Sequence, residues 1–479
     1  MNKNLRHYLW EFKGQNCLLV VILFFNALLI TLNGLGSANA LTALVAGKFT
    51  AFICWVIVMT GSYALFCFGL FLQQYQYSRC CQLMNTAIRR DVTVRLSNTT
   101  YETYHSQSSS VYSSWLTNDV TTIDQMGFYN VMDIVTQVFS VAFAAIALAT
   151  FHYILLLTTL VLAVVMYLVP KVFTKPVQRR SLAMTHANER LMNRISDVLT
   201  GFDALNLLNL RKLLVQRTVA ASQDAATHIN AWQWLNGVTS GVINGVSGLC
   251  QNTMLLLTGF MVWRHLVPIG TINASLNFAG TIFAGMTGIM TSIMDMVSVT
   301  PIFEKVAAVP IRDTTDLVPV GRFHTALQMQ DVTFAYDPNS RPILQDFSLT
   351  VAKGQKYALI GPSGSGKSTV LNLLIGNLND YQGILRYDQT NYQHIPPDSL
   401  INQVTYLDQT PFMFNDTLKN NLTMNEPYSD ETIAAVIQRV GLTDLVASLP
   451  QGLATICLLS TSSAGDAPLC SYLGATRIT

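Results

Sequence analysis

Six long apolar runs, separated by polar stretches, dominate the first 300 residues of this chain. Each run is close to the ~20 residues that cross the hydrocarbon core of a bilayer, or longer. The third and fourth runs merge into one apolar stretch, Val131–Phe173, which suits two helices joined by a tight turn. The predicted membrane helices are Cys17–Gly36, Thr50–Leu72, Val131–Thr150, His152–Phe173, Gly237–Val262 and Gly270–Val299.

Positive charge is spread unevenly between these runs. Lysines and arginines cluster before the first run, after the second and after the fourth, whereas the short loops carry only Lys48 and Arg264. Cytoplasmic loops are the ones enriched in Lys and Arg. The sequence therefore predicts a multi-pass protein of the cytoplasmic (inner or plasma) membrane, with its N-terminus and everything after the sixth run in the cytoplasm. Ala38-Asn39-Ala40 resembles a signal-peptidase site, but the run before it exceeds the about 7–15 apolar residues of a signal peptide.

Composition changes again after the sixth run. Half of all residues are hydrophobic and only 12% are charged, but beyond the run the chain reads as a soluble α/β domain with strands at Leu327–Phe334 and Ile343–Val351. Two long polar segments of the membrane region, 73–130 and 174–236, read as helical arms. The predicted segments are a membrane domain at 1–300, a proline-containing linker at 301–325, an α/β domain at 326–456 and a Ser/Ala-rich tail at 457–479.

A phosphate-binding loop lies in the α/β segment. It follows the apolar run Tyr357–Ile360, interpreted as a strand, and precedes a helical run, Val370–Ile375, which is the context that a P-loop requires. Its glycines let backbone N–H groups approach phosphate, Lys367 adds a charge, and Ser368 offers a hydroxyl to Mg²⁺. The sequence predicts a site for a nucleoside triphosphate made of Gly361, Pro362, Ser363, Gly364, Ser365, Gly366, Lys367, Ser368 and Thr369.

These motifs in series resemble an exporter-type ATP-binding cassette (ABC) half-transporter. In the membrane region, Arg89-Arg90-Asp91 and Trp115–Val120 are similar to the family's first cytoplasmic arm. The resemblance implies ATP and Mg²⁺ as ligands, with Tyr336 stacking on adenine and Gln409 contacting Mg²⁺ and the attacking water. The implied fold is an all-α, six-helix ABC type-1 exporter domain followed by an incomplete α/β P-loop NTPase domain.

The C-terminal part departs from the family pattern. After Thr455 the family continues to an L-S-G-G-Q signature, a Walker B strand ending in Asp-Glu and a switch histidine, and this chain has none of them in recognisable form. The expectation is that translation left the original reading frame near Cys457. A chain without those carboxylates is predicted to bind ATP without hydrolysing it.

Three functional hypotheses follow. The first is a subunit that couples ATP binding and hydrolysis to export, as a homodimer or a heterodimer with another half-transporter. The second is a non-catalytic, truncated fragment that binds ATP, and the third is a membrane-anchored P-loop kinase or sensor, which the arm motifs disfavour. The bilayer and an unknown exported substrate are the other predicted partners. No basic-aromatic pattern indicates nucleic acid, and none of the eight cysteines has zinc-site spacing.

Overall fold

A computed structural model describes residues 4–312, 317–337, 340–407 and 412–457. The chain forms two compact units. The helical unit comprises Met1–Thr99 and Thr103–Ile311, and the P-loop unit comprises Thr100–Glu102 and Arg312–Thr479. Each is described by itself below.

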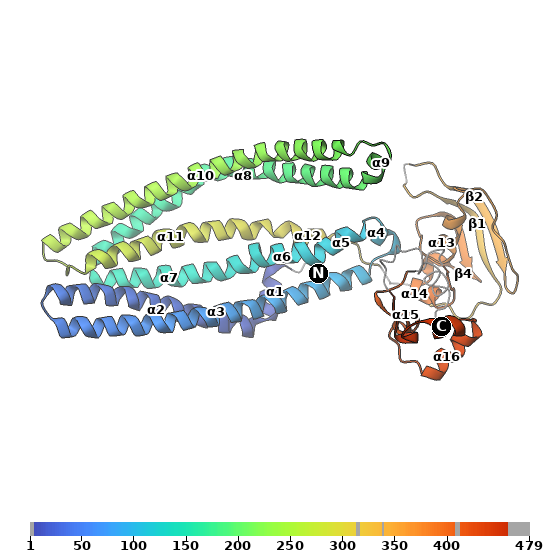
Figure 1. Cartoon of the computed structure of the whole chain (residues 1–479), viewed down its shortest axis with the longest axis horizontal. Helices are drawn as coiled ribbons and strands as arrows, with labels where there is room; N and C mark the ends of the chain where they lie inside the picture. The colour runs from blue at the N-terminus through green and yellow to red at the C-terminus, as the bar shows by residue number, and fades with distance from the viewer. Residues whose placement is uncertain (1–3, 313–316, 338–339, 408–411, 458–479) are drawn as a thin grey trace. The chain divides into compact units, whose positions relative to one another are not determined.

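Six apolar helical segments of the helical unit are long enough to cross a membrane (Figure 1). This finding confirms the six predicted spans. The helices that carry them are α2 (Lys13–Val45), α3 (Phe49–Ser97), α7 (Tyr129–Phe151), α8 (Tyr153–Thr200), α10 (Lys212–Trp263) and α11 (Thr271–Ser298). Three of them, α3, α8 and α10, have 49, 48 and 52 residues, more than twice the ~20 that a bilayer requires. Each therefore continues from its membrane span into a polar arm, and the arms are interrupted only around α4 and α9.

Shorter helices occupy the ends of these segments. Two π-helical turns, η1 and η2, interrupt the third membrane segment, and α12 covers the start of the stretch predicted as a linker. Single π-helical turns inside α-helices occur frequently at functional sites. These elements are α1 (Leu5–Glu11), α4 (Tyr101–His105), α5 (Ser109–Ser114), η1 (Trp115–Asp119), α6 (Val120–Thr122), η2 (Ile123–Phe128), α9 (Phe202–Leu207) and α12 (Thr300–Ala307).

The long helices pack in pairs. Figure 1 shows α2 beside α3, α7 beside α11, and α8 beside α10. Large apolar side chains of α3, including Ile57, Phe68 and Phe71, point outward and are at least 60% exposed. Exposed apolar surface on that scale is what lipid tails cover, so the unit is that of a multi-pass membrane protein.

The P-loop unit is built on an antiparallel sheet with the strand order β2-β1-β3-β4. Helix α13 places Val370 and Leu373 in the core under this sheet, together with Met329 and Leu385. The four strands are β1 (Ala326–Phe334), β2 (Leu344–Ala352), β3 (Gln382–Tyr387) and β4 (Thr390–Asn391). The other elements are α13 (Lys367–Leu374), η3 (Tyr392–His394), α14 (Pro397–Ile401), β5 (Asp416–Thr417), α15 (Leu418–Thr423), α16 (Asp430–Arg439), α17 (Thr443–Ser448), η4 (Gly452–Ala454) and β6 (Ile456–Cys457).

The interpretation of Tyr357–Ile360 as a strand was wrong. The run has no regular secondary structure, and the Ile360 side chain is 91% exposed. A strand needs a neighbouring strand to receive its backbone hydrogen bonds. Among the residues that the structure describes, the four sheet strands pair with one another and none pairs with this run.

Candidate nucleotide-binding site

The loop between residues 361 and 366 has a backbone that only glycine adopts readily. Gly364 and Gly366 have φ angles of +82° and +86°, in the left-handed region. Gly366 is also buried against β2, because a Cβ built on it would lie 2.9 Å from Leu344 Cδ2. Positive φ and close packing together explain why glycine stands at the last position before the helix.

Helix α13 begins directly after this loop. Gly366 is its N-cap and forms no side-chain capping bond, since glycine has none to offer. The first backbone N–H groups of a helix have no partner inside the helix, and they carry its partial positive charge. The start of α13 therefore offers uncapped donors to an anion, as in other phosphate sites at helix N-termini.

Lys367 lies across the loop that precedes it. Its ammonium donates hydrogen bonds to the carbonyl oxygens of Gly361 and Pro362, at 2.8 and 2.7 Å, and lies 3.5 Å from Ser365 Oγ. These oxygens hold the ammonium against the loop. A phosphate group can replace neutral carbonyls as partners, because charge-assisted bonds are the stronger ones.

Among the described site residues, Tyr336 is the one that lies outside the P-loop sequence. It follows β1, and its hydroxyl lies 3.3 Å from Oγ1 of Thr369 in the first turn of α13. Its ring packs edge-to-face on Phe334 with centroids 5.1 Å apart, yet the side chain stays 60% exposed. An exposed, supported aromatic ring beside a phosphate loop is suitable for stacking on a base.

The remaining site residues fall into two groups. Gly361, Pro362, Ser363, Gly364, Ser365 and Ser368 are exposed, whereas Gly366 and Thr369 are buried. Gln409 lies outside the described residues. The described chain resumes at residue 412, where Met413 is buried and Asn421 both accepts from and donates to the backbone of Phe414.

Carboxylates do not complete the site within the described part of the chain. There, Lys367 contacts only loop oxygens, and neither Lys367 nor Ser368 forms a hydrogen bond or ion pair with an aspartate or glutamate. The described residues also contain no group of three or more His, Cys, Asp or Glu that could hold a metal ion. Ser368 remains the one described residue that chemistry favours as a Mg²⁺ ligand.

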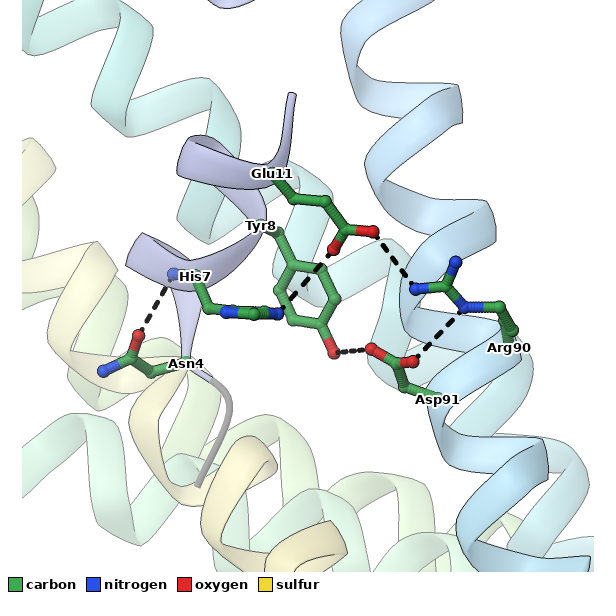
Figure 2. A network of polar contacts seen from close by, with 6 residues as sticks. All are labelled: Asn4, His7, Tyr8, Glu11, Arg90 and Asp91. Carbon is green, nitrogen blue, oxygen red and sulfur yellow. Dashed lines mark hydrogen bonds and ion pairs between the residues drawn. The ribbon is translucent and has the colours of Figure 1, made fainter. Parts of the chain in front are cut away.

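Sequence reasoning missed a polar cluster in the helical unit. Figure 2 shows Tyr8 of α1 donating to Asp91 Oδ2 of α3 at 3.0 Å, while Arg90 bridges Asp91 at 3.3 Å and Glu11 at 3.1 Å. Burial, and then the nearby Asp91 carboxylate, raise the pKa of Tyr8 well above its ordinary value. Arg90 and Asp91 belong to a recognised arm motif. No sequence signal linked them to Tyr8, because a contact across 83 positions depends on the tertiary fold.

The same region fastens α12. Lys305 forms an ion pair with Asp119 of η1, and its ammonium lies 5.2 Å from the centroid of the Trp115 ring. Arg95 donates to the carbonyl oxygens of Ala307 and Val309 at the end of the helix. The second recognised arm motif, Trp115–Val120, thus holds the helix that leads out of the helical unit.

Comparisons with known families match both units. The model of the ABC transporter transmembrane region matches residues 15–286, more than half of the chain, and the ABC transporter model matches residues 344–461. Among solved structures, a bacterial Atm1-family ABC exporter with ATP bound has a TM-score of 0.79 at 19% identity, over 97% of this chain and 83% of that one.

Curated relatives match a shorter part. The mitochondrial iron-sulfur clusters transporter ATM1 of Kluyveromyces lactis is 27% identical over 279 residues, which is 54% of this chain and 37% of the relative. ATP-binding cassette sub-family B member 6 of Mesocricetus auratus is also 27% identical, over 55% of this chain and 32% of the relative. The chain spans about a third of the length of these relatives. Because a match to the ABC transmembrane region precedes a match to the ABC transporter model, in a chain with the fold of an ABC exporter, the chain belongs to the ABC transporter family.

Proposed function

We propose that this chain is a transporter subunit that couples the binding and hydrolysis of ATP to export of a substrate across the cytoplasmic membrane. The observation that carries the proposal is the arrangement around α13. Glycines with positive φ, an uncapped helix start, Lys367 and Tyr336 converge on one exposed loop, in a chain that also has six membrane helices. The ATP phosphates and Mg²⁺ supply the reacting group when they are bound.

Each residue then has a defined task. Lys367 exchanges its contacts with Gly361 and Pro362 for phosphate oxygens, the N–H groups at the start of α13 bind the same oxygens, and Ser368 supplies a Mg²⁺ ligand. Tyr336 stacks on the base. Gln409 positions the attacking water and contacts Mg²⁺, as the family resemblance implies.

A complete exporter needs a second half. We propose a homodimer, or a heterodimer with another half-transporter, in which the N-terminus and the P-loop unit lie in the cytoplasm. The clustering of Lys and Arg beside the first, second and fourth membrane segments supports this orientation. The ATM1 relatives are named as mitochondrial transporters of iron-sulfur clusters, and a panel of transport assays in both membrane types would identify the location and the cargo.

A second candidate function is ATP binding without hydrolysis. The observation that favours it is the lack of any described carboxylate in contact with Lys367 or Ser368. In-line attack on the γ-phosphate requires a positioned water and carboxylate ligands for Mg²⁺. A membrane-anchored kinase or sensor is disfavoured by the match of the ABC transmembrane region over residues 15–286.

The experiment uses the full chain purified in detergent. Binding of a fluorescent ATP analogue is titrated for wild type, Lys367→Ala and Tyr336→Ala. The control is Lys353→Ala, which removes an exposed lysine that follows β2 and lies outside the P-loop. Loss of charge-assisted bonds to phosphate should weaken binding roughly tenfold to a hundredfold for Lys367→Ala. Loss of stacking should cost roughly 1–3 kcal/mol for Tyr336→Ala. Equal affinity in all four proteins would remove both residues from the site.

Hydrolysis separates the two candidate functions. Release of phosphate is measured in the same preparations at saturating Mg²⁺-ATP. Turnover by wild type that disappears in Lys367→Ala supports the transporter. Tight binding with phosphate release no faster than that of Lys367→Ala supports the non-catalytic ATP-binding protein instead.

A further inference from the structure

A groove of about 530 Å³ opens between the N-terminal helix and the bundle. Its walls come from α1, α7, α11 and α12, and most of its lining is apolar. Leu5 and Leu9 form the α1 side. Ile293 and Val297 form the α11 side, one turn apart, and they stay 46% and 64% exposed. A cavity of this size falls within the roughly 300–1,000 Å³ of small-molecule sites.

The groove also contains one residue of each charge. Arg6 of α1 and Glu304 of α12 both line it, and both are exposed. Among the residues that the structure describes, neither is part of an ion pair, with each other or with a third residue. An apolar groove with one cationic and one anionic group is complementary to a molecule that carries both charges and an apolar body.

The wall formed by α1 is held in place. Tyr8 bonds to Asp91 (Figure 2). Its ring also stacks on Phe303 of α12, with centroids 6.1 Å apart. Trp10, on the same helix, is 64% exposed. Tryptophan is enriched at the boundary between a membrane and water, and α1 directly precedes the first membrane helix. Ile134 and Val297, which line the groove, lie inside the predicted third and sixth membrane spans, whereas Glu304 lies beyond the sixth. The groove therefore runs across the predicted end of the apolar spans.

We propose that this groove binds one zwitterionic phospholipid that has a primary ammonium headgroup, of the phosphoethanolamine type. One acyl chain lies along Leu5, Leu9, Ile293 and Val297. The phosphate faces Arg6, and the ammonium faces Glu304. The proposal concerns the helical unit alone and does not depend on ATP hydrolysis.

The charged residues Arg6 and Glu304 favour this headgroup over those of other phospholipids. A phosphoglycerol lipid brings a net negative charge to a groove that already holds Glu304, and a carboxylate repels it. A choline headgroup has a quaternary ammonium without N–H groups, so it forms no charge-assisted hydrogen bond with Glu304. A primary ammonium has three donors, as a lysine does.

The test compares three lipids on the full chain in mild detergent. Dioleoyl phosphatidylethanolamine, phosphatidylcholine and phosphatidylglycerol are added separately, and retained lipid is counted by native mass spectrometry. We expect phosphatidylethanolamine to be retained at least about fivefold better than either of the others, which is the ratio for about 1 kcal/mol of headgroup preference. Equal retention of the three lipids, or preference for phosphatidylglycerol, overturns the proposal.

Variants locate the lipid in this groove. Arg6→Gln and Glu304→Gln should each abolish the preference for phosphatidylethanolamine, while Lys13→Gln and Glu189→Gln, which remove charges outside the groove, should keep it. Val297→Trp fills the groove from an exposed position and should abolish retention itself. An unchanged preference in Arg6→Gln, Glu304→Gln and Val297→Trp overturns the assignment. Crosslinking of a cysteine at position 297 to a second copy of the chain, in the presence of phosphatidylethanolamine, would show that a protein covers the groove and would also overturn it.

Discussion

An apolar run forms a regular helix in the helical unit of this chain, whereas an apolar run in the P-loop unit forms no strand. In the helical unit, the apolar run of α3 forms an uninterrupted helix from Phe49 to Ser97 although many of its side chains are exposed. In the P-loop unit, the apolar run Tyr357–Ile360 forms no strand, and Ile360 is exposed. A helix closes its backbone hydrogen bonds within its own segment, whereas a strand requires a second segment. The local sequence is therefore enough to determine a helix, whereas a strand also depends on a pairing partner elsewhere in the chain.

The P-loop, like a helix, depends mostly on contacts between residues close together in the sequence. It lies directly after the unpaired run, yet its glycines, Lys367 and α13 are arranged by contacts of at most a few residues along the chain and by packing on Leu344. The P-loop can therefore form next to a segment that forms no strand.

Amide hydrogen exchange should show this contrast most strongly. The amides of residues 357–360 have no sheet partner in the described structure, so they should exchange close to the unstructured rate. The amides of β1, which is paired on both sides by β2 and β3, should exchange at least about a hundredfold more slowly, a difference of about 3 kcal/mol in opening free energy. Mass spectrometry of peptides that cover residues 326–334 and 355–362 measures both in one experiment. Comparable protection of the two peptides would mean that residues 357–360 have a partner strand in solution.

The sequence predicted the features that depend on local chemistry. The six spans follow from apolar length, and the P-loop follows from glycines and a lysine at fixed spacing. Tyr336 was placed by resemblance alone, and the structure sets its hydroxyl 3.3 Å from Thr369. Three features were not predicted, because each depends on segments that are distant in the chain. They are the hydrogen bond of Tyr8 to Asp91, the ion pair of Lys305 with Asp119 and the unpaired run at 357–360.

A glycine variant tests how firmly local geometry determines the P-loop. Gly366→Ala must adopt a φ of +86° and place its Cβ against Leu344, whereas Gly364→Ala has a φ of +82° and open space around it. A left-handed backbone costs an L-residue about 1–2 kcal/mol. An alanine that relaxes out of the left-handed region in the free loop must return to it when nucleotide binds, so both variants should lose about that amount of binding free energy. Gly366→Ala should lose more, so that its affinity falls by roughly tenfold or beyond.

The same titration provides the control. Gly441→Ala imposes an equal backbone strain, at φ +71°, on a glycine that lies between α16 and α17 rather than in the loop. It should leave nucleotide affinity unchanged. Affinities that are equal for Gly364→Ala and Gly366→Ala would show that packing on Leu344 does not shape the loop.

Charge reversal tests the fastening of α12 in the helical unit. Lys305→Glu removes the ion pair with Asp119 and the contact with Trp115, and it brings two carboxylates together. A partly exposed pair and a cation–π contact are each worth about 1 kcal/mol or less, so the loss should be roughly 1–2 kcal/mol. The double variant Asp119→Lys/Lys305→Glu should recover the ion-pair part. Thermal unfolding of wild type, Lys305→Glu, Asp119→Lys and the double variant in one detergent gives the coupling energy. A coupling energy of zero would show that the pair does not hold α12.

The smallest effect should come from the hydroxyl of Tyr8. Tyr8→Phe keeps the ring on Phe303 but removes the hydrogen bond to Asp91, which should cost about 1 kcal/mol at neutral pH. Tyr75→Phe, at a side chain that is 63% exposed, is the matched control and should cost nothing measurable. If Tyr8→Phe is as stable as Tyr75→Phe, α1 is held by packing alone.

The pH dependence of the stability difference between wild type and Tyr8→Phe tests whether the Tyr8 hydroxyl causes it. Burial and Asp91 raise the pKa of Tyr8 in the folded chain above its ordinary value of 10.0. A raised pKa means that the contribution of Tyr8 is fully present below about pH 10 and is lost as the pH rises toward the folded-state pKa, because the unfolded chain then releases a proton that the folded chain retains. Wild type should therefore lose stability between pH 9 and pH 11 more steeply than Tyr8→Phe does, and the gap between them should narrow. Taking the difference between the two proteins cancels the other tyrosines. A gap that stays constant over this range would show that the Tyr8 hydroxyl titrates alike in the folded and unfolded chains, so that the hydrogen bond to Asp91 does not hold the N-terminal helix on α3.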